Sequence, residues 1–288
     1  MNEKGLDCRI NACREDLAAA HLKGQVDVPE YSDGEKRQVV AGSAHLRKAP
    51  RFDAPLETEF LFGETVTVYD ENEGWAWAQS DEDAYVGYVS ADALGKDISQ
   101  PTHRVSALRT HLYLEPDIKT LPVELLSMNA RLVVASIDGK FAKLKDGRFA
   151  IAAHLNPVAE FAGDFVAVAQ AFLGAPYLWG GRTSIGLDCS ALIQLSLQAS
   201  GIECPRDADM QETILGEALI DCQDQSAYKR SDLIFWKDHM GVMLDQARLL
   251  HANAHHMAVA IEPVALAIAR IEGTEGKVTS VRRGAGEK

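Results

Sequence analysis

Apolar and polar residues alternate with a period of two in the N-terminal half of the chain. One such stretch contains Val66 and Val68, and after the acidic turn ENEG it continues with Trp75 and Trp77. A period of two is typical of half-buried β-strands, and acidic segments with glycine favour the turns between them. The first half of the sequence therefore predicts short antiparallel strands.

A weak internal repeat runs through the same half. HLRKAP begins at His45 and HLYLEP begins at His111, and the same offset carries Trp75 onto Phe141. The repeat predicts two small antiparallel barrels, the first over residues 38–98 and the second over residues 99–157. A single irregular β-domain is the alternative interpretation. Residues 1–37 carry no motif that indicates a role.

The periodicity changes after residue 157. GDFVAVAQAFLGA has apolar residues at helical spacing and ends at Gly174, and a second helical stretch, CSALIQLSLQAS, ends at Gly201. The strand-like runs DLIFW, HMGVML, RLLHA and AVAIEPV follow. Helices followed by an antiparallel sheet predict an α+β domain over residues 158–288, unlike the strict alternation of a parallel fold.

Composition and net charge exclude two classes of binding partner. The chain of 288 residues is 47% hydrophobic with a formal net charge of −13, so we expect a folded protein that binds neither nucleic acid nor an anionic membrane surface. The N-terminus has no apolar core after a basic start, and no run approaches the length of a membrane span. We therefore expect a cytoplasmic protein.

Cysteine and histidine spacing argues against a metal centre. The five cysteines are scattered and odd in number, which predicts reduced thiols. Paired C-x-x-C motifs do not occur, and His255 and His256 form an isolated pair that we interpret as surface histidines. We expect neither a metal nor another cofactor.

Cys189 is the candidate nucleophile. It follows a glycine-rich loop in GGRTSIGLDCSALIQ and lies at the first turn of a predicted helix, where unpaired N–H groups stabilise a thiolate and can hold an oxyanion. A buried structural cysteine is the alternative. His239 opens one predicted strand and His251 lies in the next, so a hairpin would place both on one face. A cysteine mechanism needs such a base and a partner that orients it.

Several sequence blocks resemble known families. The first barrel resembles a bacterial SH3-type domain in its L-x-x-x-P, G-E-x-V-x-V and G-Y-V segments. The blocks PYLWGGRTSIGLDCSALIQ, CPRDADMQ, SDLIFW, HMGVML and RLLHA resemble, in that order, the NlpC family of papain-like cell-wall peptidases. This resemblance implies that Cys189 is the nucleophile, His239 the base and His251 the orienting residue. It also implies that Tyr177 helps to stabilise the oxyanion.

The whole layout resembles γ-D-glutamyl-L-diamino-acid endopeptidases of the dipeptidyl-peptidase VI type. That resemblance implies hydrolysis of the bond between γ-D-glutamate and meso-diaminopimelate or L-lysine, in murein tri- or tetrapeptides with a free N-terminal L-alanine, during cell-wall peptide recycling. It implies that the first barrel forms one wall of the substrate groove. The residues implied in substrate binding are Tyr85, Glu59 (in preference to Glu57), Trp179, Asp188, Ser190, Asp207 and Asp238.

Asp238 directly precedes the predicted base, so we expect it to raise the pKa of His239 or to touch substrate. Two other functions remain open at this stage. One is a catalytically inactive peptidoglycan-binding protein, and the other is an amidase or acyltransferase on the same papain-like fold. The sequence leaves open the preferred diamino acid and the oligomeric state.

Overall fold

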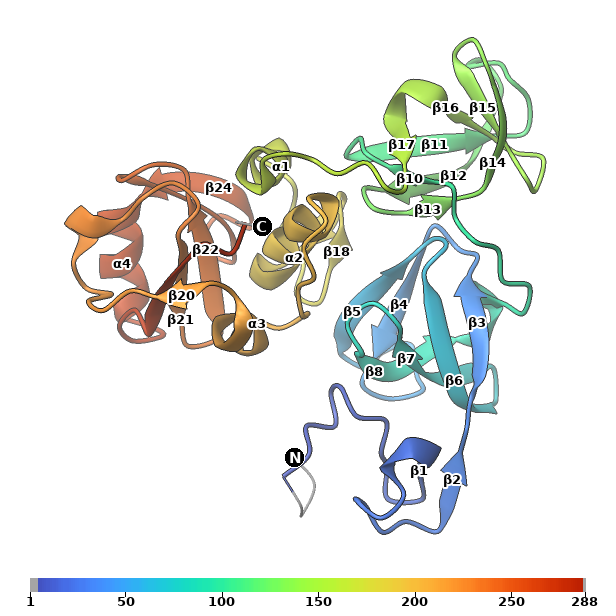
Figure 1. Cartoon of the computed structure of the whole chain (residues 1–288), viewed down its shortest axis with the longest axis horizontal. Coiled ribbons are helices and arrows are strands. Elements are labelled where there is room, and N and C mark those ends of the chain that lie inside the picture. The colour runs from blue at the N-terminus through green and yellow to red at the C-terminus, as the bar shows by residue number, and fades with distance from the viewer. Residues whose placement is uncertain (1–4, 287–288) are drawn as a thin grey trace. The chain divides into compact units, whose positions relative to one another are not determined.

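The computed structural model describes residues 5–286 and forms two compact units, Met1–Glu160 and Phe161–Lys288. Figure 1 shows their elements, β-strands throughout the first unit and mixed helices and strands in the second. The junction follows shortly after the boundary predicted at residue 157. No helix in the described part of the chain is long and apolar enough to cross a membrane.

The N-terminal segment folds against the first barrel. It contains β1 (Leu17–Ala19), η1 (Ala20–Leu22) and β2 (Glu30–Ser32), and β1 and β2 form a parallel pair. Its apolar residues cluster with Trp77 of the barrel. The Arg14 guanidinium lies 4.5 Å from the Trp77 ring centroid and 2.8 Å from a carboxylate oxygen of Asp70. The N-terminal segment is therefore an ordered part of the first unit that packs on the first barrel.

The first barrel is a seven-stranded sheet in the order β5-β4-β8-β7-β6-β3-β9. Its elements are β3 (Glu35–Val39), β4 (Ser43–Arg47), β5 (Leu56–Leu61), β6 (Thr65–Asn72), β7 (Trp75–Ser80), β8 (Val86–Ser90), η2 (Ala91–Ala93) and β9 (Leu94–Gly95). The first strand starts at Glu35, inside the segment predicted to precede the barrel. Leu46, Phe60, Val66 and Val89 belong to its apolar core.

Residues 103–157 form a second small β-domain with a core of its own, which includes Leu112, Leu126 and Leu132. The elements are β10 (His103–Val105), β11 (Arg109–Tyr113), β12 (Pro122–Ser127), β13 (Arg131–Leu132), β14 (Val134–Asp138), β15 (Phe141–Leu144), β16 (Phe149–Ile151), η3 (Ala152–His154) and β17 (Leu155–Pro157). They form two sheets, β12-β11-β16-β15-β14 and β13-β10-β17.

The repeat seen in the sequence is also present in the strand pairing. Strands β4 and β5 pair with a register shift after Leu46, and β11 and β12 pair with a register shift after Leu112. These two leucines hold the same place in the H-L-x-x-x-P motif of each copy. Strands β4 and β11 have equal lengths, as do β5 and β12, and each pair is offset by the 66 residues of the repeat. These equal lengths, the repeated register shift and the two separate cores favour two related β-domains over one irregular domain.

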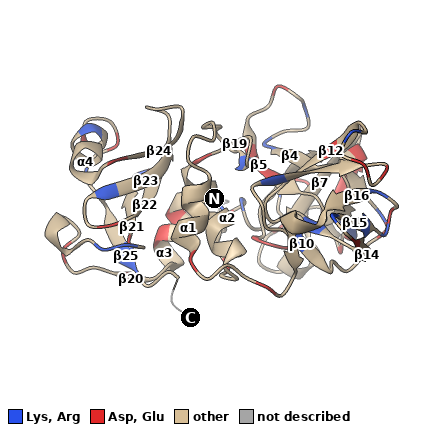
Figure 2. Ribbon diagram, turned by 90° about the horizontal axis from the view of Figure 1, so that it is seen from above, with Lys and Arg blue, Asp and Glu red and all other residues tan. Residues whose placement is uncertain are grey.

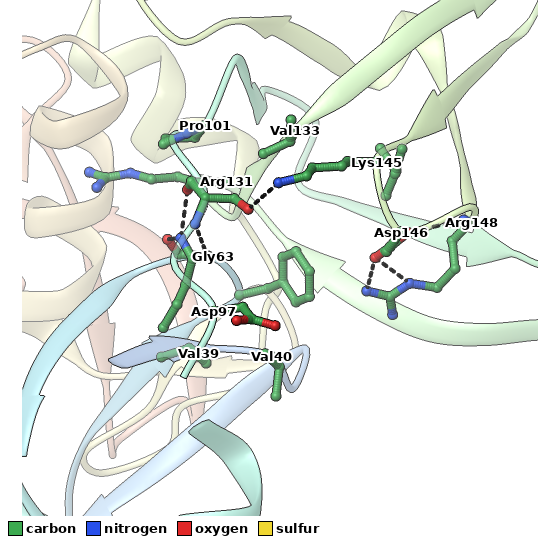
Figure 3. Close-up of a pocket in the computed structure, with 14 residues that line it drawn as sticks. Val39, Val40, Gly63, Asp97, Pro101, Arg131, Val133, Lys145, Asp146 and Arg148 are labelled. Atoms are coloured by element: carbon green, nitrogen blue, oxygen red, sulfur yellow. Dashed lines mark hydrogen bonds and ion pairs between the residues drawn. The ribbon is translucent and has the colours of Figure 1, made fainter. Parts of the chain in front are cut away.

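A cavity of about 300 Å³ lies where the two β-domains meet within the first unit. Figure 3 shows residues of both domains around it. The Arg148 guanidinium lies 5.2 Å from the Phe62 ring centroid and pairs with Asp146, and Lys145 Nζ donates to Ser99 Oγ at 3.0 Å. The basic side chains of Arg148 and Lys145 that line this cavity are thus bound by neighbouring residues of the same unit. Its lining includes none of the predicted site residues.

The second unit contains a six-stranded antiparallel sheet in the order β20-β25-β21-β22-β23-β24. Its elements are α1 (Phe165–Ala171), β18 (Arg182–Thr183), β19 (Gly186–Leu187), α2 (Cys189–Ala199), α3 (Ala208–Ile214), β20 (Glu217–Ala218), η4 (Gln225–Ala227), β21 (Leu233–Trp236), β22 (His239–Met243), β23 (Arg248–Asn253), β24 (Ala258–Pro263), α4 (Val264–Glu272) and β25 (Ser280–Arg283). The predicted α+β class is confirmed, and α4 is a helix that the sequence reasoning did not anticipate.

Helices cover both faces of this sheet (Figure 1). Helix α2 is buried from Cys189 through Leu197 and packs against β22 and β23. Helix α4 packs Val264, Ala267 and Ile271 against the other face, where Ile234 lies. Because α2 is enclosed by the sheet and its neighbours, it is a rigid support for a residue at its N-terminus. Acidic and basic residues are interspersed over both units (Figure 2).

Candidate active site

A short hairpin places the candidate nucleophile. Strands β18 and β19 pair through Arg182 and Leu187, and a Cβ atom on Gly181 would lie 2.5 Å from the Gly186 carbonyl oxygen. Glycine is therefore required at residue 181 for the two backbones to approach this closely. The hairpin leads directly into Asp188, which is the N-cap of α2.

Asp188 holds the start of α2 together. Its carboxylate accepts hydrogen bonds from the backbone N–H groups of Ala191 at 2.9 Å and Gly180 at 3.0 Å. It also pairs with Arg206 at 2.6 Å, and that arginine is 1% exposed. Ser190 Oγ lies between them, accepting from Arg206 at 2.8 Å and donating to Asp188 at 3.2 Å. Both residues were predicted to bind substrate, and the structure employs their polar groups in this network.

Arg206 is a residue that the sequence reasoning missed. It lies in the block CPRDADMQ, where only Asp207 was singled out. A buried guanidinium with a bidentate carboxylate partner is far more specific than an exposed pair, because both charges have lost their water. An arginine beside a proline, in a block that also carries an N-cap aspartate, was the available signal.

Cys189 is the first residue of α2 and is 7% exposed. Burial raises the pKa of its thiol to about 12, and the neighbouring Asp188 carboxylate adds to the increase. Hydrogen bonding from the Met240 backbone and the charge of Arg206 act in the opposite direction but do not outweigh burial. The expected stabilisation of a thiolate by the helix start is thus overcome by desolvation. Burial therefore favours the neutral thiol over the thiolate at Cys189.

The two predicted histidines meet across neighbouring strands. Strands β22 and β23 pair in antiparallel register at Val242 and Leu250. This pairing places His239 Nε2 at 2.8 Å from His251 Nδ1. The Met240 backbone that affects the Cys189 thiol follows His239 directly. The structure therefore brings the two predicted histidines together, as the hairpin argument anticipated, and places the Cys189 thiol beside the backbone of the residue that follows His239.

A carboxylate extends this series and was also missed. Glu262 Oε1 lies 2.7 Å from His251 Nε2 and pairs with the guanidinium of Arg270 on α4. Its hydrogen bond with His251, together with the charges of His251 and Arg270, lowers the pKa of Glu262 to about 2 in spite of partial burial. His251 pairs with Ala260 across the strands, so Glu262 is its diagonal neighbour. The lone carboxylate in AVAIEPV was the signal.

The effect expected of Asp238 on the base is wrong. The pKa of His239 is lowered to about 3, first by burial and then by repulsion from His251 when that ring is protonated and from Arg270. Asp238 is exposed and has a φ of 62°. Its charge instead acts on Glu275, where burial and Asp238 together raise the carboxyl pKa. A carboxylate in water has little influence on an imidazole buried behind the strand.

The other predicted residues of this unit lie around the thiol or at the surface. Tyr177 is half-buried, and burial followed by the charges of Cys189 and Asp188 raises the pKa of its hydroxyl. Its backbone N–H donates to the Met257 carbonyl at 3.0 Å. The side chain of Trp179 is 66% exposed. Asp207 is the half-buried N-cap residue of α3.

Tyr85 and Glu59 belong to the first unit and are described only within it. Tyr85 packs in the core cluster of the first barrel and is 3% exposed. Glu59 lies on β5, with His45 Nε2 at 3.3 Å and Ser43 Oγ at 3.4 Å from its carboxylate. Their contact with substrate stays a prediction.

One group of side chains has the donor atoms of a metal site. The potential ligand atoms of His251, His256 and Glu262 lie within 4.8 Å of one another. The sequence reasoning considered only the neighbouring pair His255 and His256. In this structure the His251 and Glu262 donors are already bonded to each other, and Arg270 adds a cation beside them. The group therefore serves a hydrogen-bond series in the state described here.

Comparison with known families agrees with this geometry. Residues 174–270 match the NlpC/P60 family, and residues 46–94 match the bacterial dipeptidyl-peptidase SH3 domain. The first match spans Cys189, His239 and His251, and the second spans most of the first barrel. The second β-domain lies outside both matched ranges.

Individual relatives are similar over most of their length. The chain is 27% identical over 242 residues to the γ-D-glutamyl-L-lysine dipeptidyl-peptidase of Bacillus cereus, covering 73% of this chain and 71% of the relative. It is 26% identical over 240 residues to dipeptidyl-peptidase 6 of Lysinibacillus sphaericus, covering 75% and 86%. A crystal structure of an NlpC/P60 family protein from Bacillus cereus shares the fold with a TM-score of 0.72 at 21% identity, covering 87% of this chain and 100% of that one.

Proposed function

We propose that this chain, a cysteine peptidase of the NlpC/P60 family with a dipeptidyl-peptidase type SH3 domain, hydrolyses γ-D-glutamyl–diamino acid bonds in murein peptides. The observation that carries the proposal is that Cys189, at the start of α2, lies beside the Met240 backbone on β22, the strand whose His239 is hydrogen-bonded to His251. Relatives named γ-D-glutamyl-L-lysine dipeptidyl-peptidases support the choice of bond.

The reaction follows from the neutral resting pair. His239 takes the proton of the Cys189 thiol while the sulfur attacks the γ-carbonyl carbon of D-glutamate, which forms a tetrahedral oxyanion. Backbone N–H groups at the start of α2 and the Tyr177 hydroxyl are the proposed donors to that oxyanion. The protonated His239 then gives its proton to the leaving amine of the diamino acid. A thioester on Cys189 remains.

Water completes the cycle. His239 removes a proton from the water molecule that attacks the thioester, and returns it to the departing sulfur. The products are L-alanyl-D-glutamate and a peptide or amino acid that begins with the diamino acid. His251 keeps the His239 ring oriented through both steps, because their hydrogen bond occupies Nε2 and leaves Nδ1 for the proton transfers.

The proposal includes the N-terminus of the substrate. Enzymes that release a dipeptide from an N-terminus must recognise a free ammonium group, and a buried ammonium needs acceptors or opposite charge. Tyr85 and Glu59 are the proposed partners of this group. Free peptides of this kind arise when cell-wall material is degraded, so we place the enzyme in cell-wall peptide recycling in the cytoplasm.

The test is mass spectrometry of three substrates incubated with the pure chain. We expect L-Ala-γ-D-Glu-meso-diaminopimelate to yield L-Ala-D-Glu, and the N-acetylated peptide and whole sacculi to be cut at least ~100-fold more slowly, since an unpaired buried charge costs several kcal/mol. The lysine peptide run in parallel gives the diamino acid preference. Release of free L-alanine, or equal rates on free and acetylated peptides, would contradict the proposed specificity.

Variants locate the activity on the proposed thiol. Cys189→Ala should abolish hydrolysis, because no thioester can form. Cys222→Ser removes a different thiol of the same unit, one that lies beside the backbone of Val278 and has no place in the mechanism, and should keep most activity. Retention of activity in Cys189→Ala would remove the cysteine peptidase mechanism.

A further inference from the structure

We propose that Glu262 is a positioning residue that sets the proton arrangement of the two histidines and so makes His239 a base toward Cys189. This inference rests on the proposed peptidase function. Its physical basis is the continuous series from Glu262 through His251 to His239, with atom separations of 2.7 Å and 2.8 Å. His251, in the middle of the series, is fully buried.

Each neutral imidazole has one N–H and one acceptor nitrogen, so the bonds in this series are not independent. A Glu262 carboxylate can only accept, and therefore requires the proton of His251 on Nε2. His251 Nδ1 is then an acceptor, which requires the proton of His239 on Nε2. His239 Nδ1 is left with a lone pair and can take a proton. The charge state of Glu262 thus determines whether His239, two hydrogen bonds away along the series, can act as a base.

The opposite arrangement is the inactive one. If Glu262 were protonated or replaced by an apolar residue, His251 could carry its proton on Nδ1 and donate to His239 Nε2. His239 would then carry its own proton on Nδ1, which is the nitrogen needed for the thiol. A base with its proton on the wrong nitrogen loses most of its catalytic value even when its geometry is intact.

Two groups keep the Glu262 carboxylate charged: Arg270 on α4 forms an ion pair with it, and His251 on β23 donates a hydrogen bond to it. His256, in the connection between β23 and β24, faces His251 and helps to lower its pKa. The pKa of Glu262 is well below its ordinary value and that of His251 is lowered by burial. Around neutral pH the series therefore consists of one carboxylate and two neutral imidazoles.

The matched variants are Glu262→Gln and Glu272→Gln. The first removes the charge next to His251 and keeps the size of the side chain. The second makes the same change at an exposed glutamate at the end of α4. Glu262→Gln should lower kcat by about 10- to 100-fold, the range found when the carboxylate that orients a metal-binding histidine is replaced, since the orienting hydrogen bond is of the same kind. KM should change little, because the residue does not touch substrate. Glu262→Asp should recover part of the loss.

The deciding measurement is the ¹⁵N NMR spectrum of the histidine rings in the substrate-free chain. We expect His239 and His251 to be protonated on Nε2 in the unaltered protein and in Glu272→Gln. In Glu262→Gln we expect at least one of the two histidines to be protonated on Nδ1, either fully or as a mixture of the Nδ1 and Nε2 tautomers. Nδ1 protonation of His239 in the unaltered protein, or unchanged rings and unchanged kcat in Glu262→Gln, would overturn the inference. The spectrum needs no substrate, so this outcome is separate from failure of the proposed peptidase activity.

A second inference rests on the N-terminal segment. Cys8 Sγ and Cys13 Sγ lie 3.2 Å apart, although four residues stand between them in the sequence. A turn closed by hydrogen bonds from the Ile10 and Asn11 backbone to the Asp7 carbonyl brings them together. A disulfide bond has a sulfur separation of about 2.05 Å, so only a small movement separates the two states. We infer that Cys8 and Cys13 form a reversible disulfide.

The bond would fix the turn on the first barrel. The Arg9 carbonyl accepts from the Val86 backbone at 2.7 Å, and the Ile10 carbonyl accepts from Gln79 Nε2 at 2.9 Å. Both acceptors lie inside the ring that a Cys8–Cys13 disulfide would close. Exchange with a small disulfide forms it: one thiolate attacks oxidised glutathione and releases one glutathione thiol, and the second thiolate attacks the mixed disulfide and releases the other.

Thiol counting and peptide mapping test this inference on the full chain. After treatment with oxidised glutathione we expect a Cys8–Cys13 disulfide peptide, slower hydrogen exchange at the Val86 amide, and reversal by dithiothreitol. In Cys8→Ser, Cys13 should instead stop at a mixed disulfide with glutathione. Separate glutathione adducts on Cys8 and Cys13 in the unaltered chain, or thiols that remain open to alkylation after the treatment, would refute it.

Discussion

Replacing Arg206 with methionine should destabilise the catalytic unit and slow its nucleophile. The substitution leaves the Asp188 carboxylate buried with the Ala191 and Gly180 N–H groups but without its cation. Removing one partner of a buried ion pair costs about 3–5 kcal/mol of unfolding free energy. Arg248→Met is the control, since its pair with Asp245 is largely exposed and such pairs contribute at most about 1 kcal/mol.

A double-mutant cycle separates the pair from general disruption. Asp188→Asn strands the buried guanidinium of Arg206 and should also be destabilising. The double variant should lose about 1–3 kcal/mol less than the sum of the two single variants, because each single variant leaves one unpaired buried charge and the double variant leaves none. Urea unfolding of the four proteins of the cycle and of the Arg248→Met control, followed by far-UV circular dichroism, gives the free energies. Full additivity, or a loss in Arg206→Met as small as that in Arg248→Met, would refute the reasoning.

The same variants should change the nucleophile in opposite directions. The charge of Asp188 raises the pKa of Cys189 and that of Arg206 lowers it. Arg206→Met should therefore slow alkylation of Cys189 by iodoacetamide at fixed pH, and Asp188→Asn should accelerate it. Both variants should be less stable, but one should slow the alkylation of Cys189 and the other should accelerate it. A general loosening of the fold would change both rates in the same direction. Equal slowing in both would contradict the electrostatic part of the account.

Further predictions concern the histidines, the thiol and Glu262. His239→Ala should lower kcat by about 100-fold or more, and His251→Asn should be milder than His251→Ala because an amide can still orient the ring; equal losses in both His251 variants would exclude an orienting role. Because the pKa of Cys189 is raised to about 12, its alkylation should keep rising with pH above neutrality, and a plateau below pH 7 would indicate a thiolate in the resting enzyme. Because the pKa of Glu262 is lowered to about 2, the stability that Glu262→Gln lacks should be greatest above pH 4.5 and fade as the pH falls toward 2, and a pH-independent difference by urea unfolding would contradict this linkage.

The candidate site was predictable where its chemistry and the strand order are local in the sequence. Cys189 could be placed at a helix start from its glycine-rich approach, and the close spacing of His239 and His251 sufficed to predict a hairpin that brings them together. The α+β class followed from the change of apolar period after residue 157. These features depend on neighbours in the sequence or on one strand pairing.

The supporting residues depend on contacts that no local pattern contains. Arg206 reaches Asp188 across 18 residues of sequence, and Arg14 of the N-terminal segment reaches Asp70 across 56. Such long-range ion pairs have no periodic signature. The prediction that Asp238 raises the pKa of His239 was wrong for a related reason. The position of Asp238 next to His239 in the sequence does not indicate that its carboxylate is exposed to water.

Helix α4 shows a further limit. Its residues, VALAIARIE, directly follow AVAIEP, and the sequence reasoning identified AVAIEPV as a strand-like run without a prediction for the residues after it. Pro263 marks the transition, because it lies at the N-cap and cannot continue the strand ladder. Recognition of that helix would have placed Arg270 beside Glu262 and exposed the series that ends at His239.

The most direct test of the central claim is the intact mass of the chain shortly after mixing with L-Ala-γ-D-Glu-meso-diaminopimelate and quenching with acid. The account predicts a population heavier by one L-alanyl-γ-D-glutamyl group, attached to Cys189 and absent from Cys189→Ala. Attachment of that group to another residue, or turnover of the peptide by Cys189→Ala at the rate of the unaltered chain, would contradict it.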